Sequence, residues 1–126
     1  MDITPQVPEG RQMIRAYDGS GFEISGTRYD SAVLVFPEMT VAWGYSGDVA
    51  DMTPADLAPV FAAEVPVEVL LIGAGANFAM AGAGLREDLR ARGIGLECMD
   101  TGAACRTYNV LMAEDRQVAA ALLPAA

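Results

Sequence analysis

The chain has 126 residues, a net charge of −9 and a hydrophobic fraction of 52%, which together indicate a single compact domain. All 8 basic residues are arginines, because the chain contains neither lysine nor histidine. An acidic chain without a basic cluster does not suit nucleic acid, and the missing residues exclude His-dependent triads, His-based zinc sites, Schiff-base lysines and phosphate-loop lysines.

The apolar stretches are short, which predicts no direct membrane insertion. The longest run over residues 32–37, 65–76 and 118–126, all below the roughly 20 residues that span a bilayer. The first residues lack the basic and apolar regions of a secretory signal. Cys98 and Cys105 do not form a paired zinc motif, so we expect free thiols rather than a redox pair, with no metal and no cofactor. These features predict a soluble, cytoplasmic protein.

The first third of the chain predicts antiparallel hairpins within one domain spanning residues 1–126. Residues 1–12 hold two prolines and few apolar residues, which indicates a flexible or draped arm. Phe22 and Ile24 alternate with polar residues ahead of a turn at residues 26–27. An apolar run over residues 31–36 and a short strand over residues 40–43 follow.

The rest of the chain predicts alternating helices and strands. Thr53 and Pro54 begin a first helix, as N-cap and first helical residue. Strands are expected at residues 67–72, 94–99 and 118–123, with helices at 85–92 and from about residue 100 to 114. A strand-helix-strand unit of this length makes its two strands parallel, so we predict an α/β fold with a mixed sheet and a C-terminal β-α-β-α-β half.

The sequence Gly73-Ala74-Gly75 follows a predicted parallel strand, where backbone amides can cradle an anion. The dinucleotide-binding pattern requires a further glycine at the position of Phe78. We therefore favour glycines that serve a tight turn over a ligand-binding loop.

The helix after Asp100 mixes polar and apolar residues. Thr101 is expected as its N-cap, and Arg106 shares a face with Asn109. Arg106 could bind an anionic ligand, although we favour an internal ion pair with Asp100, Glu97 or Glu114. Because the two loops follow parallel strands, they predict one crevice for a ligand or a partner, with these candidates: Gly73, Ala74, Gly75, Asp100, Thr101, Cys105, Arg106, Tyr108 and Asn109.

Two further residues leave alternatives open. Cys105 lies near a helix N-terminus, which can activate a thiol, although burial as a small hydrophobic residue is favoured. Trp43 is a candidate interface anchor, and a position in the core or at its rim is the alternative.

Several segments together resemble a known family. They are Gly21-Phe22-Glu23-Ile24-Ser25-Gly26, Trp43, residues 69–75 and residues 99–111, followed by Glu114, Arg116 and residues 118–122. Over roughly residues 19–123 the chain resembles the domain-of-unknown-function family that includes mitochondrial complex I assembly factor 3. The resemblance implies a three-layer α/β fold with a mixed central sheet and no established catalytic residues. The arm before about Gly19 lacks the arginine-rich, acid-poor character of a transit peptide, which predicts a bacterial member. Many relatives carry Thr where this chain has Ala74, which weakens a ligand-binding role for that loop.

The resemblance and the missing catalytic groups predict a non-enzymatic accessory or assembly protein in respiratory-complex or membrane-protein biogenesis. We expect protein partners among membrane-complex subunits, and self-association stays open. The alternative is a protein that binds a small anionic molecule, or an enzyme of unfamiliar type, using the crevice near Gly73, Thr101 and Arg106.

Overall fold

The structure is a computed structural model that describes residues 10–125. Most of the predicted arm, residues 1–9, lies outside the described residues. Its described end is attached to the rest of the chain, because the N–H of Gln12 donates to the carbonyl of Pro37 at 2.9 Å.

Most strands and helices follow the predicted order. The strands are β1 (Ile14–Asp18), β2 (Gly21–Ile24), β3 (Thr27–Tyr29), β4 (Val33–Val35), β5 (Thr40–Ala42), β6 (Val69–Gly73), β7 (Gly95–Met99) and β8 (Val118–Leu122). The helices are the 3₁₀ helices η1 (Val49–Asp51) and η2 (Pro54–Leu57) and the α-helices α1 (Ala58–Phe61), α2 (Ala83–Ala91) and α3 (Thr101–Ala113).

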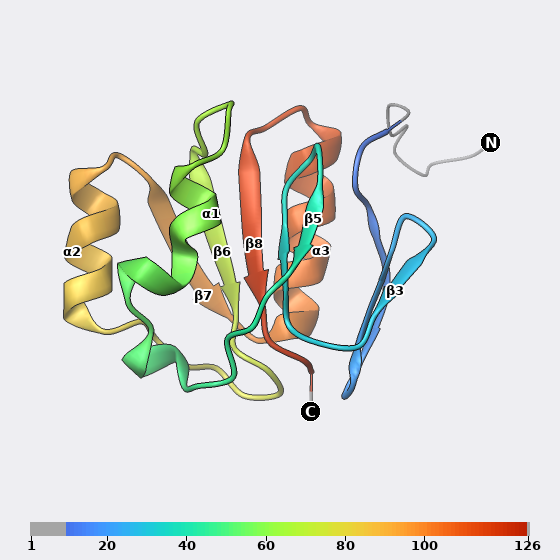
Figure 1. Cartoon of the computed structure of the whole chain (residues 1–126), viewed down its shortest axis with the longest axis horizontal. Helices are drawn as coiled ribbons and strands as arrows, with labels where there is room; N and C mark the ends of the chain where they lie inside the picture. Colours follow the sequence, from blue (N-terminus) through green and yellow to red (C-terminus); the bar gives the residue numbers. More distant parts are fainter. Residues whose placement is uncertain (1–9, 126) are drawn as a thin grey trace.

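A mixed five-stranded sheet occupies the middle of the molecule, as predicted (Figure 1). Its strand order is β5-β4-β8-β6-β7. Strand β6 is parallel to both β7 and β8, whereas β4 is antiparallel to β5 and β8. Strands β1, β2 and β3 form a separate antiparallel sheet.

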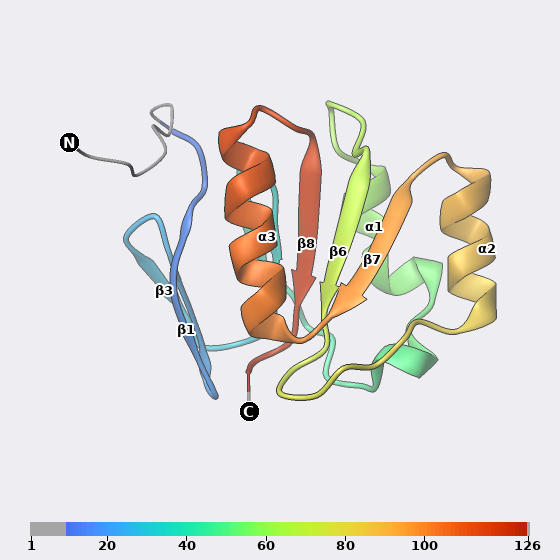
Figure 2. The same ribbon diagram turned by 180° about the vertical axis from the view of Figure 1, so that it is seen from behind.

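The molecule has three layers, with helices on both faces of the central sheet. Helices α1 and α2 cover one face, and α3 covers the other, with the three-stranded sheet beside it (Figures 1 and 2). Successive residues of a strand point to opposite faces. Leu70 and Ile72 therefore pack toward α2, and Leu71 packs toward α3 with Tyr108 and Met112. The predicted α/β class and layering are confirmed.

Two local features differ from the sequence-based expectation. The turn between β2 and β3 lies at Ser25-Gly26, where φ is 46° and 89°, and not at residues 26–27. Positive φ at both positions is the geometry that closes a two-residue hairpin. This turn adds the unpredicted strand β3. The helix expected after Thr53 is only η2 and one turn of α1, because Pro59 lacks the N–H group that a longer helix would need.

Candidate functional site

The buried Thr101 hydroxyl joins three segments at the carboxyl end of β6. Thr101 is 0% exposed. Its oxygen accepts a hydrogen bond from the N–H of Gly75 at 2.8 Å, and its hydroxyl donates to the carbonyl of Leu123 at 2.6 Å. Its backbone N–H donates to the carbonyl of Gly75 at 2.9 Å. Thr101 therefore holds the glycine loop, α3 and the segment after β8 together.

Two backbone amides of the glycine loop donate hydrogen bonds within the protein. The N–H of Ala74 donates to the last carbonyl of β7 at 2.8 Å, and that of Gly75 donates to Thr101. A Cβ on Gly73 would lie 2.8 Å from Leu122 Cδ2 and 3.0 Å from Thr101 Oγ1, and Gly75 has a φ of +86°. Close packing and backbone conformation thus account for both glycines, and the two amides are not available to an anion.

Asp100, and not Thr101, is the N-cap of α3. The Asp100 carboxylate accepts a hydrogen bond from the N–H of Ala103 at 2.9 Å. The predicted N-cap was therefore wrong by one residue, because the Thr101 hydroxyl is already engaged on the side of the glycine loop.

The polar residues of α3 hold the first strand. Asn109 Oδ1 accepts from the N–H of Ile14 at 2.9 Å, and Nδ2 donates to the Ile14 carbonyl at 2.8 Å. The Tyr108 hydroxyl donates to the carbonyl of Gln12 at 2.8 Å. Burial raises the pKa of Tyr108, which keeps this hydroxyl protonated as a donor. These residues position β1 against α3.

Arg106 lies beside β1 and not within the glycine loop. Its Nη1 donates to the hydroxyl of Tyr17 at 3.1 Å, and the side chain is exposed. Within residues 10–125, Arg106 forms no ion pair, so the expected partners Asp100, Glu97 and Glu114 do not hold it. The candidate residues therefore divide into a loop group around Thr101 and a helix group directed at β1.

The two cysteines have separate surroundings. Cys105 packs with the buried residues on the α3 side of the sheet, whereas Cys98 packs with those on the α2 side. Burial raises the pKa of the Cys105 thiol to about 12, which outweighs the opposing effect of Arg106. Cys105 is therefore a protonated core side chain at neutral pH.

A cavity of about 670 Å³ opens at the same end of the sheet. Trp43 and Tyr45 form part of its wall, together with Ser31 and Asn77. The two rings stack with centroids 5.1 Å apart, and the Trp43 indole donates to the carbonyl of Asp56 at 2.8 Å. Trp43 is only 7% exposed, so it supports the wall and does not project as an anchor.

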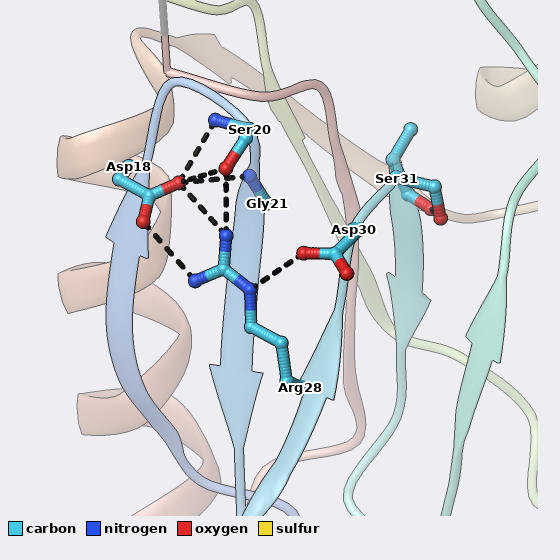
Figure 3. Close-up of polar contacts among 7 residues, drawn as sticks. Asp18, Ser20, Gly21, Arg28, Asp30 and Ser31 are labelled. Atoms are coloured by element: carbon cyan, nitrogen blue, oxygen red, sulfur yellow. Dashed lines mark hydrogen bonds and ion pairs between the residues drawn. The ribbon is translucent and has the colours of Figure 1, made fainter.

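An arginine network that was not predicted from the sequence lies beside this cavity (Figure 3). Arg28 donates to both Asp18 oxygens, at 3.0 and 3.1 Å, and to Asp30 at 2.9 Å. Arg28, helped by Ser20, holds the pKa of Asp18 well below its usual range. The only signal in the sequence is the turn-forming run Asp18-Gly19-Ser20-Gly21. Because Arg28 is already neutralised, the network joins the strands and is not open to an external anion.

Among residues 10–125, no group of three or more His, Cys, Asp or Glu side chains is arranged to hold a metal ion. No helix in that range is both long and apolar enough to cross a membrane. At the carboxyl end of β6, the Thr101 hydroxyl and the N–H groups of Ala74 and Gly75 are engaged in hydrogen bonds within the fold.

Most of the chain is similar in sequence to curated proteins. NADH dehydrogenase [ubiquinone] 1 alpha subcomplex assembly factor 3 of Danio rerio is 36% identical over 89% of this chain and 64% of its own length. The chain therefore spans slightly less than two thirds of that relative. An uncharacterised protein of Rhodobacter capsulatus is 37% identical, over 97% of this chain and 94% of its own.

A solved structure from Bordetella parapertussis shares the fold. It superposes with a TM-score of 0.81 at 38% identity, covering 93% of this chain and 99% of the other. The family model described as a protein of unknown function (DUF498/DUF598) matches residues 14–123. This chain therefore belongs to the DUF498/DUF598 family.

Proposed function

We propose that this protein is a non-enzymatic assembly factor that acts through protein–protein contacts in the biogenesis of a respiratory NADH dehydrogenase. The observation that carries the proposal is the identity of 36% over 89% of the chain with a relative named as an assembly factor of that enzyme. Because the chain spans 64% of that relative, its partners are inferred for the shared domain only.

The geometry of the candidate residues supports a binding role over a catalytic one. Three candidate side chains form hydrogen bonds with backbone groups of the same chain: Thr101, Asn109 and Tyr108. The Cys105 thiol stays protonated because burial raises its pKa to about 12. Catalysis needs polar groups that remain free to contact a substrate, and these side chains do not meet that need.

The same geometry does not favour a small anionic ligand at Gly73, Thr101 and Arg106. The Thr101 hydroxyl is fully engaged, and Arg106 lies against Tyr17 of β1. A bidentate anion site needs an arginine aimed into the loop, and Arg106 is not aimed there.

Crosslinking in the native cell tests the assembly role. The tagged chain is crosslinked, purified under denaturing conditions and analysed by quantitative mass spectrometry. We expect enrichment of NADH dehydrogenase subunits over a tagged acidic domain of equal size and net charge. Untagged chain supplied in excess should compete with the signal.

The crosslinked residues add a second readout. If partners are captured through one face, crosslinks should cluster on neighbouring surface residues of this chain. An absence of NADH dehydrogenase subunits at full crosslinking yield would contradict the proposal, and so would an even scatter of crosslinks that untagged chain does not compete away.

A further inference from the structure

Strand β7 (Gly95–Met99) is an outer strand of the central sheet with one unpaired edge. Among residues 10–125 it pairs only with β6, and it lies at the end of the sheet in both views (Figures 1 and 2). The opposite end of the sheet is formed by the three-residue strand β5. An exposed edge offers backbone hydrogen bonds to another chain unless something covers it.

The hydrogen bonds of β7 show which groups face outward. The N–H of Gly95 donates to the carbonyl of Glu68, and the carbonyl of Met99 accepts from the N–H of Ala74. In a parallel pair, alternate residues bond to the same neighbour. Leu96 and Cys98 therefore direct their N–H and C=O groups to the free edge, and within residues 10–125 no backbone group pairs with them there.

Helix α2 lies beyond β7 in Figures 1 and 2. Residues of both elements line a groove of about 630 Å³. Half-buried Leu96 and Cys98 form part of its floor. Phe78, 64% exposed, and Met80, 53% exposed, also line it. Apolar surface thus continues from the side chains of β7 to side chains that lie open to solvent.

Two of the eight arginines also line this groove. Arg86 and Arg90 lie one turn apart on α2, and both are exposed. Arg86 forms no ion pair within residues 10–125, and Arg90 makes only a 3.8 Å contact with Glu87. Of the described residues, Glu97, between Leu96 and Cys98, is the one carboxylate residue in the lining, and strand alternation directs its side chain to the face opposite theirs. The groove is therefore mostly apolar, with two arginines and one glutamate as its charged lining residues, in a chain of net charge −9.

We propose that the β7 edge binds an extended acidic segment of a partner protein, which joins the central sheet as a sixth strand alongside α2. Backbone groups of Leu96 and Cys98 supply the strand pairing, and Phe78 and Met80 contact apolar side chains of the segment. Arg86 and Arg90 bind its carboxylates, for which a planar guanidinium is well suited. Met, Phe and Arg are residue types that protein interfaces favour.

Charge separates this occupant from a second copy of the chain. Antiparallel pairing of two β7 strands would place two α2 helices on the same face, with Arg86 and Arg90 of both copies around one groove. The four arginines brought together in this way oppose self-pairing, whereas an acidic segment is attracted to the two arginines of one copy. A strand edge that binds another protein would serve the proposed assembly function. The binding of an acidic segment does not depend on that function, and only the identity of the natural partner rests on it.

Selection from a displayed library of random twelve-residue peptides tests the proposal on the purified chain. We expect enriched peptides that alternate apolar and acidic residues. Fluorescence anisotropy of a labelled selected peptide then gives its Kd. The double substitution R86E/R90E should weaken binding at least about tenfold. The control R15E/R116E changes two exposed arginines outside α2 and β7 and has the same net charge, and it should leave the Kd unchanged.

Strand pairing has its own signature. Two sets of N-methylated versions of the selected peptide are compared. Methylation of the backbone nitrogens that face β7 should abolish binding, and methylation of the alternate nitrogens, which face away, should preserve it. Peptide binding should slow the solvent exchange of the Leu96 and Cys98 amides. Circular dichroism of both double variants confirms that they fold.

Three outcomes would overturn the proposal: no enriched peptide, equal binding to R86E/R90E, or equal effects of the two sets of methylation. Chain self-association at the β7 edge, detected by sedimentation with exchange protection of Leu96, would overturn it as well. All of these are measured on the purified chain, so they are distinguishable from a failure of the assembly role in the cell.

Discussion

The Thr101 side chain is a fully buried polar group whose donor and acceptor are both satisfied by backbone atoms. Its oxygen accepts from Gly75 and its hydroxyl donates to Leu123, at 2.8 and 2.6 Å. A buried backbone group that loses its partner carries the full cost of desolvation. Thr101 therefore contributes to the fold at the position where a ligand-binding role was considered.

The substitution Thr101→Val should lower the free energy of unfolding by about 2 kcal/mol or more, because the Gly75 N–H and the Leu123 carbonyl lose a buried partner. Urea denaturation measures the change. Thr107→Val is the matched control, since the Thr107 hydroxyl makes only a 3.6 Å contact with the Met99 sulfur. Equal losses for the two variants would show that the Thr101 hydrogen bonds do not stabilise the fold.

Substitution by alanine should change the stability of the fold in opposite directions at Gly73 and Gly84. A Cβ at Gly73 meets Leu122 at 2.8 Å and Thr101 at 3.0 Å, so Gly73→Ala should destabilise by about 1–3 kcal/mol. A Cβ at Gly84, within α2, meets open space, so Gly84→Ala should stabilise by up to about 1 kcal/mol. Thermal unfolding of both variants gives the comparison. A stable Gly73→Ala protein would mean that the loop does not need this close approach.

Cys105 should be unreactive in the folded protein. Burial raises its pKa to about 12 from an ordinary value of 9.0, so the folded state favours the protonated thiol. This contribution to stability is fully present below pH 9 and is lost as pH rises toward 12. In a Cys98→Ser chain, a disulfide reagent at pH 8 should label Cys105 only after addition of urea. Rapid labelling without urea would contradict its burial.

At the scale of elements, α3 connects the two sheets. Asn109 exchanges two hydrogen bonds with Ile14, at 2.9 and 2.8 Å, as a neighbouring strand would do. The Tyr108 hydroxyl adds a bond to Gln12. Polar side chains of α3 thus supply hydrogen bonds to β1 on the side where no further strand pairs with it among the described residues.

The substitution Asn109→Ala should loosen the three-stranded sheet while leaving the central sheet intact. Both backbone groups of Ile14 lose their partner, so amides of β1 and β2 should exchange with solvent faster. Amides of β6 and β8 should keep their protection. Val110→Ala, at an exposed position of the same helix, is the control and should change neither sheet. Uniformly faster exchange in both sheets would contradict a local role for Asn109.

The β-α-β-α-β half could be predicted because its elements have clear periodic patterns and glycine or proline boundaries. Apolar residues at Leu85 and Leu89 repeat at helical spacing, and Gly93 with φ +76° ends α2. The β3 strand could not be predicted, since its exposed residues show no alternation and it exists through pairing with β2. The partners of Arg106 and Asn109 depend on contacts 89 and 95 residues apart, which local patterns do not contain.

At the scale of the whole molecule, charge and exposed apolar surface are unevenly distributed. The chain carries a net charge of −9, yet Arg86 and Arg90 lie together at the β7 edge with exposed Phe78 and Met80. The polar groups at the strand ends, in contrast, are engaged inside the fold. This division supports a function carried by an outer surface and not by an enclosed catalytic site.

The level of assembled NADH dehydrogenase in cells that lack this chain tests the proposed function most directly. Native gel electrophoresis with an in-gel activity stain measures the assembled enzyme, and immunoblotting measures its separate subunits. We predict less assembled enzyme at normal subunit synthesis, restored by the wild-type chain and by R15E/R116E. A normal level of active, assembled enzyme in cells without the chain would contradict an assembly role.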